Sequence, residues 1–201
     1  EMPGKGDRRG LAVRGDDMDY PLAPLILALV IVLKLTDSGP LLYGHRRVGF
    51  GGREFRCWKF RTMVVNGDAV LEQYLRKHPA KAALWYEQRK LVDDPRVTPL
   101  GAVLRKLSLD ELPQLLNVLT GEMSLVGPRP MMPDQEVLYS GEGYYRLRPG
   151  ITGFWQTAGR NKTTFAARAW YDDRYERGLS FASDLSILVR TVSVVLGRTG
   201  C

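Results

Sequence analysis

The sequence predicts a mainly α-helical α+β fold with a small β-hairpin, in a monotopic protein held at one face of a membrane. Helical patterns dominate the chain after the hairpin, and two strand-like runs flank the turn Phe50-Gly51-Gly52. Residues 22–35 form an apolar run that is shorter than the ~20 residues a spanning helix needs. We therefore expect a flexible polar tail (1–20), a membrane-inserted segment (21–36) and one folded domain (37–201).

Composition narrows the classes of partner. The chain has 201 residues, enough for one compact domain with a sizeable core. Its formal charge is +7 and its pI about 9.5, which suits nucleic acid, anionic lipid or a phosphorylated substrate. No tract interleaves arginines with aromatic residues, so we expect no nucleic-acid partner. Cys57 and Cys201 match no zinc or redox motif, which fits a reduced, cytoplasm-facing protein.

The apolar run is expected to enter the membrane as a short re-entrant helix with both ends on the cytoplasmic side. Basic residues stand on both sides of it: Lys5, Arg8, Arg9 and Arg14 before it, and Lys34, Arg46 and Arg47 after it. The positive-inside rule places both flanks in the cytoplasm. Pro21 and Pro24 can break or kink the helix. A buried core helix is the alternative, although residues 25–33 show no polar stripe.

Turn signals and periodicity predict the elements of the folded domain. In chain order they are strands at 41–49 and 53–63, a helix from 67 to about 91 that Pro79 interrupts, a short helix from Pro99, and helices at 164–177 and 184–196. Residues 131–150 are typical of loop. Ser183 is the expected N-cap of the final helix, and Gly178 and Gly197 end the last two helices. The final helix is apolar enough to lie on a membrane surface as an amphipathic helix, and core packing explains it equally well.

The acidic pair Asp110-Glu111 is the strongest candidate for chemistry. It begins a helix whose leucines we expect to lie in the core: Leu112, Leu115, Leu116 and Leu119. A carboxylate held at a helix start near cations can act as a nucleophile toward phosphorus. An adjacent carboxylate can hold Mg²⁺ together with phosphate oxygens and water. The alternative is structural, because Ser108 and Glu111 have the spacing of a capping box.

Cationic side chains near this pair suit phosphate. Arg105 lies just upstream, and Arg129 stands between two prolines whose fixed φ pre-organises its planar fork. On the second expected strand, Lys59 and Arg61 point to one side and Phe60 to the other. A solvated surface turn and a charged strand edge are the structural alternatives for these cations.

A third candidate segment is GFWQTAGRN, at residues 153–161, which could hold a nucleotide base or ribose. Its polar candidates are Gln156, Arg160 and Asn161. Trp155 is equally typical of a core residue. Asp172 and Asp173 have the pattern of charge on a helix surface, and the two histidines show no metal-ligand spacing.

Taken together, these motifs resemble the bacterial monotopic phosphoglycosyl transferases, the bacterial sugar transferases that begin exopolysaccharide, O-antigen and glycoprotein glycan assembly. The matching stretches are DSGPLLYGHRRVGFGGREFRCWKFRTM at 37–63, DDPRVTPLGAVLRKLSLDELPQLLNVLTGEMSLVGPRP at 93–130, RPGITGFWQTAGRN at 148–161 and YDDRYERGLSFASDLSILVRT at 171–191. The first stretch is most similar to exopolysaccharide initiators that use UDP-galactose or UDP-glucose. Family members usually carry a full first half-helix before Pro24, and RGLAVRGDDMDYPLAP stands there in this chain.

The resemblance implies a two-step reaction. Asp110 attacks the sugar-bearing phosphate of a UDP-sugar and releases UMP, and polyprenyl (undecaprenyl) phosphate then takes the phosphosugar. In this interpretation Asp110 and Glu111 hold Mg²⁺, Lys59, Arg105 and Arg129 contact phosphate, and Gln156, Arg160, Asn161 and Asp172 lie near the nucleotide-sugar site. The resemblance also implies the inner (cytoplasmic) membrane, with the catalytic domain in the cytoplasm. Membrane lipid, a second copy of the chain and downstream glycosyltransferases are the expected partners.

Two other functions fit parts of the sequence. A soluble Mg-dependent phosphotransferase or phosphohydrolase would act on a water-soluble acceptor and would need no detergent. A non-catalytic membrane adaptor would bind anionic lipid through its basic face, and substitution of Asp110 would leave its function intact. The sugar and the length of the polyprenol stay open at this point.

Overall fold

The computed structural model describes residues 30–31, 33–34, 39–88, 91, 93–158 and 163–197. Its strands are β1 (Leu42–Val48), β2 (Glu54–Phe60), β3 (Ser124–Val126) and β4 (Gly150–Thr152). Its α-helices are α2 (Gly67–Lys77), α3 (Pro79–Gln88), α4 (Pro99–Lys106), α5 (Gln114–Leu119), α6 (Phe154–Ala158), α7 (Arg168–Arg177) and α8 (Phe181–Leu196). Short 3₁₀ helices are η1 (Phe50–Gly52), η2 (Leu109–Glu111), η3 (Pro133–Leu138) and η4 (Gly143–Arg146). Helices with two small two-stranded sheets confirm the α+β prediction.

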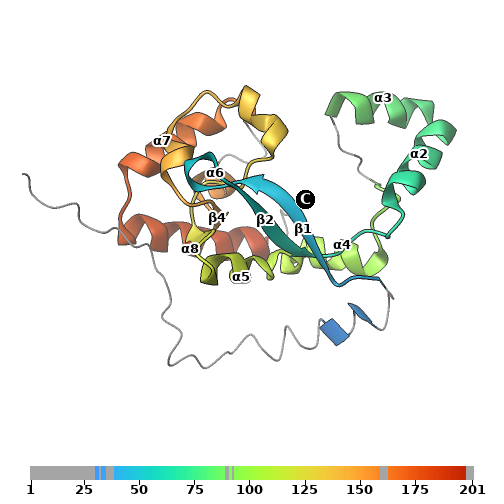
Figure 1. Ribbon diagram of the computed structural model, residues 1–201, viewed down its shortest axis with the longest axis horizontal. Coiled ribbons are helices and arrows are strands. Elements are labelled where there is room, and N and C mark those ends of the chain that lie inside the picture. Colours follow the sequence, from blue (N-terminus) through green and yellow to red (C-terminus); the bar gives the residue numbers. More distant parts are fainter. Residues whose placement is uncertain are drawn as a thin grey trace, which may run out of the picture.

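The hairpin of β1 and β2 crosses the middle of the molecule (Figure 1). The strands pair antiparallel from Leu42 opposite Phe60 down to the turn. Gly51 and Gly52 in that turn have φ of 65° and 78°, a region that favours glycine. The predicted hairpin is thus confirmed. Helices α4, α5 and α8 lie along one side of it, and α2 and α3 extend away from it (Figure 1).

Alternation along β2 sends side chains to two different surroundings. Phe60 is 4% exposed and packs with Leu33 and Leu104. Cys57 lies on the opposite face, buried against Met123. The edge of β2 is covered by α5, because the Asn117 side chain accepts from the backbone N–H of residue 58 and donates to the carbonyl of residue 56. This clamp fixes the hairpin against the helix that follows the acidic pair.

Helix α4 is held tightly against the segment that leaves the hairpin. Thr98 caps it by accepting a hydrogen bond from Gly101 N at 2.9 Å, and Pro99 occupies its first turn. A Cβ on Gly101 would lie 2.1 Å from the Thr62 carbonyl oxygen, so only glycine allows this approach. The predicted helix from Pro99 is confirmed, and its position brings Arg105 beside Thr62.

The capping-box alternative at the acidic pair is wrong. Ser108 adopts a left-handed conformation with φ 55°, and its side chain makes no capping hydrogen bond. The backbone turns through η2 before α5 begins at Gln114, and the side chain of Glu111 binds Lys59. The structural alternative for Glu111 therefore fails on geometry.

Two leucines predicted to lie in the core are in fact on the surface. Leu116 and Leu119 on α5 are 49% and 56% exposed. Leu112 does pack against the cluster of Leu33, Phe60 and Leu104. The prediction failed because it assumed one helix from residue 109, whereas the turn at η2 rotates the α5 face away from the core.

The C-terminal elements begin at different residues from those predicted. Helix α7 begins at Arg168 rather than at residue 164. Helix α8 begins at Phe181, since Ser180 forms a capping box with Ser183, one turn earlier than expected. Gly178 and Gly197 follow α7 and α8 as predicted. Strands β3 and β4 pair in parallel and join α5 to α6 and α8.

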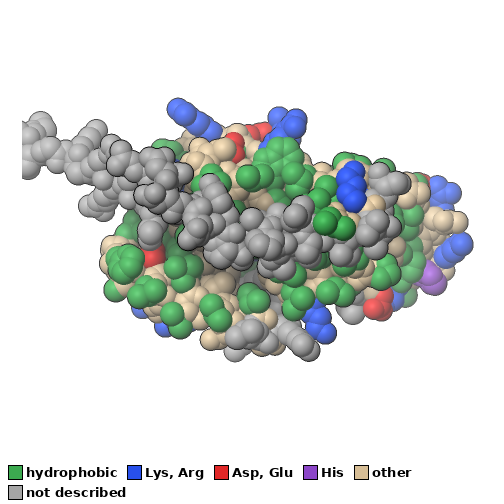
Figure 2. Space-filling model, turned by 90° about the horizontal axis from the view of Figure 1, so that it is seen from below, with side chains coloured by type: hydrophobic (Ala, Val, Ile, Leu, Met, Phe, Trp, Pro, Cys, Tyr) green, Lys and Arg blue, Asp and Glu red, His purple; other side chains and the backbone are tan. Residues whose placement is uncertain are grey.

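An apolar stripe runs along the exposed side of α8. Its members recur at helical spacing and are 50–71% exposed: Phe181, Leu185, Val189 and Val192. Figure 2 shows hydrophobic side chains prevailing over charged ones on the face of the molecule formed by α4, α5 and α8. The opposite side of α8 packs Ile187 against Val126 and Tyr175. This helix is amphipathic, so core packing is confirmed for one side, and membrane contact by the exposed stripe stays a prediction.

No helix in the described part of the chain is long and apolar enough to cross a membrane. Of the expected membrane-inserted segment 21–36, the described residues are Val30, Ile31, Leu33 and Lys34, all helical. Leu33 is buried in the cluster with Phe60 and Leu104. The tail 1–20 and the rest of the segment lie outside the described residues, so the re-entrant helix stays a prediction.

Candidate active site

The acidic pair and one lysine form the centre of the site. Nζ of Lys59 lies 2.6 Å from Oε1 of Glu111 and 3.9 Å from Oδ2 of Asp110. Lys59 reaches the pair from β2, and the turn η2 presents both carboxylates to it. A single ammonium therefore contacts two adjacent carboxylates, which keeps them together despite their mutual repulsion.

Burial shapes the acid–base behaviour of Asp110. Its residue is 9% exposed, and burial raises the pKa of its carboxyl above the ordinary value. The positive charges of Lys59 and Arg105 oppose this rise in pKa, and the negative charge of Glu111 adds to it. Asp110 is thus a desolvated carboxylate whose ionised form depends on the cations around it.

Arg105 is positioned from α4. Its Nε donates a 2.9 Å hydrogen bond to Oγ1 of Thr62, which is buried just past β2. This bond leaves the terminal nitrogens of the guanidinium free of Thr62. The predicted phosphate contact of Arg105 stays a prediction, supported by its charge effect on the Asp110 pKa.

A small cavity opens beside the pair and is lined mainly by polar side chains. It is lined by Arg47, Cys57, Lys59, Glu111, Gln114, Arg129, Pro130 and Ile151. Arg47 comes from β1, and burial, together with the nearby positive charge of Arg129, lowers its pKa. Three cations from three separate segments thus line one cavity of about 10 Å³, and such cations can bind a phosphate group placed against them.

The turn that carries Arg129 is held along its whole backbone. Gly150 N donates to the Pro128 carbonyl at 2.8 Å, and Val48 N donates to the Met131 carbonyl at 2.9 Å. Arg47 Nη1 donates to the Pro130 carbonyl at 3.3 Å. The carbonyl of Arg129 itself accepts a hydrogen bond from Arg168. The guanidinium of Arg129 is therefore presented from a backbone that cannot easily shift.

Asp172 is linked to this turn through Arg168, which contacts the Asp172 carboxylate and donates to the Arg129 carbonyl. Arg168 on α7 is 2% exposed, and its Nε lies 3.4 Å from Oδ2 of Asp172. Tyr139 donates to the same carboxylate oxygen at 3.0 Å. Burial raises the pKa of Asp172 to about 6, and the charge of Arg168 opposes the rise. The alternative of surface charge is wrong for Asp172, because this residue is 2% exposed.

Of the segment 153–161, the structure describes residues 153–158. Both polar atoms of the Gln156 side-chain amide are buried, and within the described part of the chain neither has a hydrogen-bond partner. A buried amide without a partner is costly, and a ligand can satisfy it. Trp155 Nε1 donates to Oγ1 of Thr163 at 3.0 Å. Arg160 and Asn161 lie outside the described residues.

Asp110 and Glu111 fit the expected Mg²⁺ in their chemistry. Mg²⁺ in enzyme sites takes one or two carboxylates, and substrate phosphate oxygens and water complete its octahedron. The two adjacent carboxylates, beside a cationic cavity, provide the protein's part of that set of ligands. Among the described residues, no group of three or more His, Cys, Asp or Glu side chains gathers around a point.

Three residues of the site were not singled out as site residues from the sequence. In the sequence, Arg47 is recognised only as part of a basic flank. The pairing register of β1 with β2 is the signal that identifies it as a site residue. Alternation from Lys59 through the hairpin pairing puts Arg47 on the same face. No local pattern marks Gln114 or Arg168 as a site residue. Gln114 stands at the start of a helix, and Arg168 is buried through contacts with a turn that is distant in sequence.

The fold and the site define a class of enzyme. A buried carboxylate, held beside a second carboxylate and cations that line a cavity, is arranged to transfer a phosphate-bearing group.

Comparison with known proteins narrows the class. Residues 20–198 match the bacterial sugar transferase family. The chain is 51% identical over 176 residues to the exopolysaccharide production protein ExoY of Sinorhizobium fredii, covering 87% of this chain and 78% of that protein. It is 48% identical over 180 residues to the UDP-galactose-lipid carrier transferase of Erwinia amylovora (88% and 38%). It is 39% identical over 188 residues to the UDP-glucose:undecaprenyl-phosphate glucose-1-phosphate transferase of Xanthomonas campestris (88% and 36%). The chain belongs to the bacterial sugar transferase family and is a phosphoglycosyl transferase.

Proposed function

We propose that the enzyme transfers hexose-1-phosphate from a UDP-sugar, UDP-galactose or UDP-glucose, to polyprenyl (undecaprenyl) phosphate, as the first step of exopolysaccharide or related glycan assembly. The names of the relatives support the donor and the acceptor. One observation carries the proposal. The ammonium of Lys59 contacts the carboxylates of Asp110 and Glu111, and this group lies beside the cavity that Arg129 lines.

We propose that the chemistry proceeds in two displacements. In the first, a carboxylate oxygen of Asp110 forms a bond to the sugar-bearing phosphorus, and the bond from that phosphorus to the bridging oxygen breaks, so UMP leaves. In the second, an oxygen of the polyprenyl phosphate forms a bond to the same phosphorus, and the bond to Asp110 breaks. The carboxylate is regenerated, and the product is a polyprenyl diphosphate sugar.

The cations make the approach of two anions feasible. Lys59, Arg105 and Arg129 neutralise the diphosphate while the anionic carboxylate approaches. The clamped backbone of residues 128–131 holds the Cα of Arg129 in place, which lowers the entropic cost of bringing its fork to a phosphate. Mg²⁺ held by Asp110 and Glu111 would supply further neutralisation of phosphate charge. Gln156, whose buried amide has no hydrogen-bond partner among the described residues, is proposed to contact the nucleotide-sugar.

The acceptor requires a membrane, and we propose that the apolar face of α5 and α8 rests on it. Leu116 and Leu119 on α5 are exposed, as is the α8 stripe, and both helices belong to the face seen in Figure 2. Apolar side chains at this exposure are costly in water and stable in the acyl boundary of a lipid leaflet. We propose that this contact lies on the cytoplasmic face of the inner membrane. A homo-oligomer and contacts with downstream glycosyltransferases stay predictions.

One assay tests the proposal. The purified protein is incubated with single UDP-sugars, Mg²⁺ and polyprenyl phosphate in detergent, and UMP and lipid-linked sugar are measured. We expect UMP release with UDP-galactose or UDP-glucose and formation of a polyprenyl diphosphate hexose. Release of UDP in place of UMP would contradict the proposal, because the bond broken would then be the glycosidic one. Transfer to water-soluble acceptors alone would favour the soluble phosphotransferase.

A further inference from the structure

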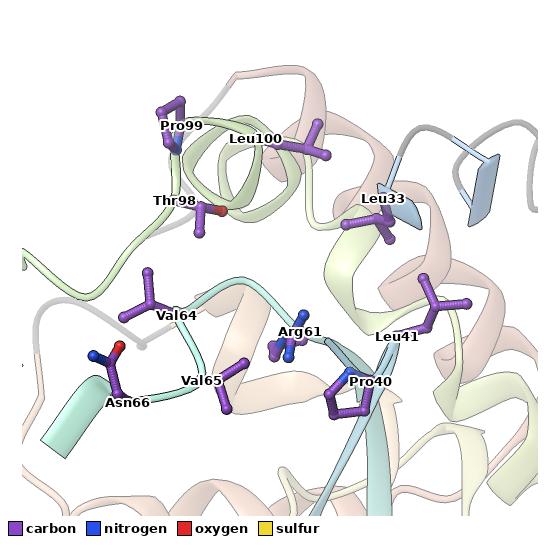
Figure 3. A pocket seen from close by; sticks show the side chains of 10 residues that line it. All are labelled: Leu33, Pro40, Leu41, Arg61, Val64, Val65, Asn66, Thr98, Pro99 and Leu100. Atoms are coloured by element: carbon purple, nitrogen blue, oxygen red, sulfur yellow. The ribbon is translucent and has the colours of Figure 1, made fainter. Parts of the chain in front are cut away.

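A groove of about 600 Å³ lies between the apolar N-terminal segment and α4. Apolar side chains make up most of its lining: Leu33, Pro40, Leu41, Val64, Val65, Pro99 and Leu100. Thr98 and Asn66 add polar groups, and Arg61 supplies the only charge among the described lining residues. In Figure 3, Arg61 lies between Pro40 and Val65, and Leu33 and Leu100 stand together at one end. A mostly apolar lining with few polar groups is typical of a site for an amphiphile.

Packing connects this groove to the catalytic pair. Leu33, which lines the groove, belongs to a buried cluster with Phe60 and Leu104. Leu109 and Leu112, which flank the acidic pair, pack against the same cluster. One continuous apolar layer therefore runs from the described end of the expected membrane segment to the residues beside Asp110.

Hydrogen bonds connect the groove to a phosphate-binding candidate as well. Thr98, at the groove, donates its backbone N–H to the Thr62 carbonyl at 3.0 Å. Thr62 Oγ1 in turn accepts from Arg105 Nε at 2.9 Å. The groove therefore shares a hydrogen-bonded framework with Arg105, and Arg61 in its lining offers a cation for the phosphate of a lipid.

We propose that this groove binds the first isoprenoid units of the lipid acceptor and directs its phosphate to Asp110. The assignment rests on the proposed function, which makes the acceptor a prenyl phosphate. An ordinary phospholipid would have the same general shape. It does not react, however, and the connection of the groove to the acidic pair through α4 and Thr62 favours the reacting lipid.

Filling the groove tests this proposal. Val65 lines it and is 70% exposed, so Val65→Trp narrows the groove with little effect on the core. Val137 on η3 is 88% exposed and does not line it, so Val137→Trp is the matched control. For each protein, kcat/KM is measured with a long-chain polyprenyl phosphate and with prenyl phosphate of a single isoprene unit, at saturating UDP-sugar.

The proposal predicts a chain-length effect. In Val65→Trp the ratio of kcat/KM for the long acceptor to that for the single-isoprene acceptor falls about tenfold, since excluding two methylene groups costs about that much affinity. The ratio for Val137→Trp equals that of the wild type. An unchanged ratio in Val65→Trp, or an equal loss with both acceptors, overturns the proposal and assigns the groove to a phospholipid or a segment of the protein. Failure of the wild type to release UMP would instead contradict the proposed function.

Discussion

Nζ of Lys59 lies 2.6 Å from Glu111 and 3.9 Å from Asp110, so one strand residue contacts both carboxylates of the acidic pair. The hairpin thereby controls the charge state of the proposed nucleophile. Burial raises the pKa of Asp110, and Lys59 is the largest of the influences that lower it. The ionised carboxylate at neutral pH thus depends on a residue that lies far away in the sequence.

Lys59→Met is expected to shift the pH dependence of the reaction. Removing the ammonium takes away stabilisation of the Asp110 carboxylate, so the Asp110 pKa rises further and the nucleophile is protonated at higher pH. The acidic limb of the pH profile of kcat should therefore move upward. Lys59→Arg keeps the positive charge and should keep the limb near its wild-type position. A limb that stays in place in Lys59→Met would show that Asp110 does not titrate in this step.

Arg129→Lys separates positioning from stability. Lysine keeps the charge but loses the planar fork that can hold two phosphate oxygens. We expect kcat/KM for the UDP-sugar to fall tenfold or more, a loss of about 1.4 kcal/mol of transition-state stabilisation. The melting temperature should hardly change, because the hydrogen bonds that clamp this turn use its backbone. A large fall in melting temperature with normal specific activity would support the alternative of a purely structural turn.

Asp172 is expected to make stability depend on pH in an unusual direction. Its pKa in the folded protein is about 6, above the ~3.9 of an unfolded aspartate. Between those values the folded state binds more protons, so the contribution of Asp172 to stability is fully present below about pH 4 and is lost as the pH rises through about 6.

Asp172→Asn measures this contribution. The free energy of unfolding of the wild type minus that of Asp172→Asn should fall as the pH rises from about 4 to about 6, and then stay level. Denaturant titrations of both proteins at several pH values, in the same detergent, give this difference. A difference that is constant across the range, or that rises, would show that the buried carboxyl keeps an ordinary or lowered pKa beside Arg168.

The apolar face should bind lipid. Replacing Leu119 and Val189 together by glutamate puts two charges on the face that we propose rests on the membrane. The fraction of protein that sediments with liposomes should fall clearly, because charge at the acyl boundary is costly. Val137→Glu, at an exposed position of η3, provides the control and should bind as the wild type does. Equal binding by both variants would place the membrane contact elsewhere.

Local signals predicted those parts of the fold that depend on neighbouring residues. The hairpin follows from its glycine turn, and α4 follows from Thr98 and Pro99. The capping box failed because Ser108 adopts a left-handed conformation, which no spacing rule records. For the same reason Leu116 and Leu119 were placed in the core.

The candidate site was predicted where it consists of short motifs and missed where it depends on distant contacts. The acidic pair and the Pro-Arg-Pro turn stand out in the sequence, and the fold brings Glu111 and Arg129 to one cavity. Arg47 and Arg168 act through backbone carbonyls of that turn, more than 30 residues away in each case. Such contacts leave no periodic or motif signal. Asp172 was singled out through the resemblance, and its link to Arg168 is visible only in the fold.

The central claim is that Asp110 carries the phosphosugar, and intact-protein mass spectrometry tests it most directly. The protein is incubated with UDP-sugar and Mg²⁺ without acceptor, and the reaction is then quenched in acid. We expect the mass of the wild type to rise by one phosphohexose group, with UMP formed in equal amount, and the adduct to disappear when polyprenyl phosphate is added. Asp110→Asn should form neither adduct nor UMP, although its size and fold are preserved. Turnover by Asp110→Asn near the wild-type rate would contradict the account.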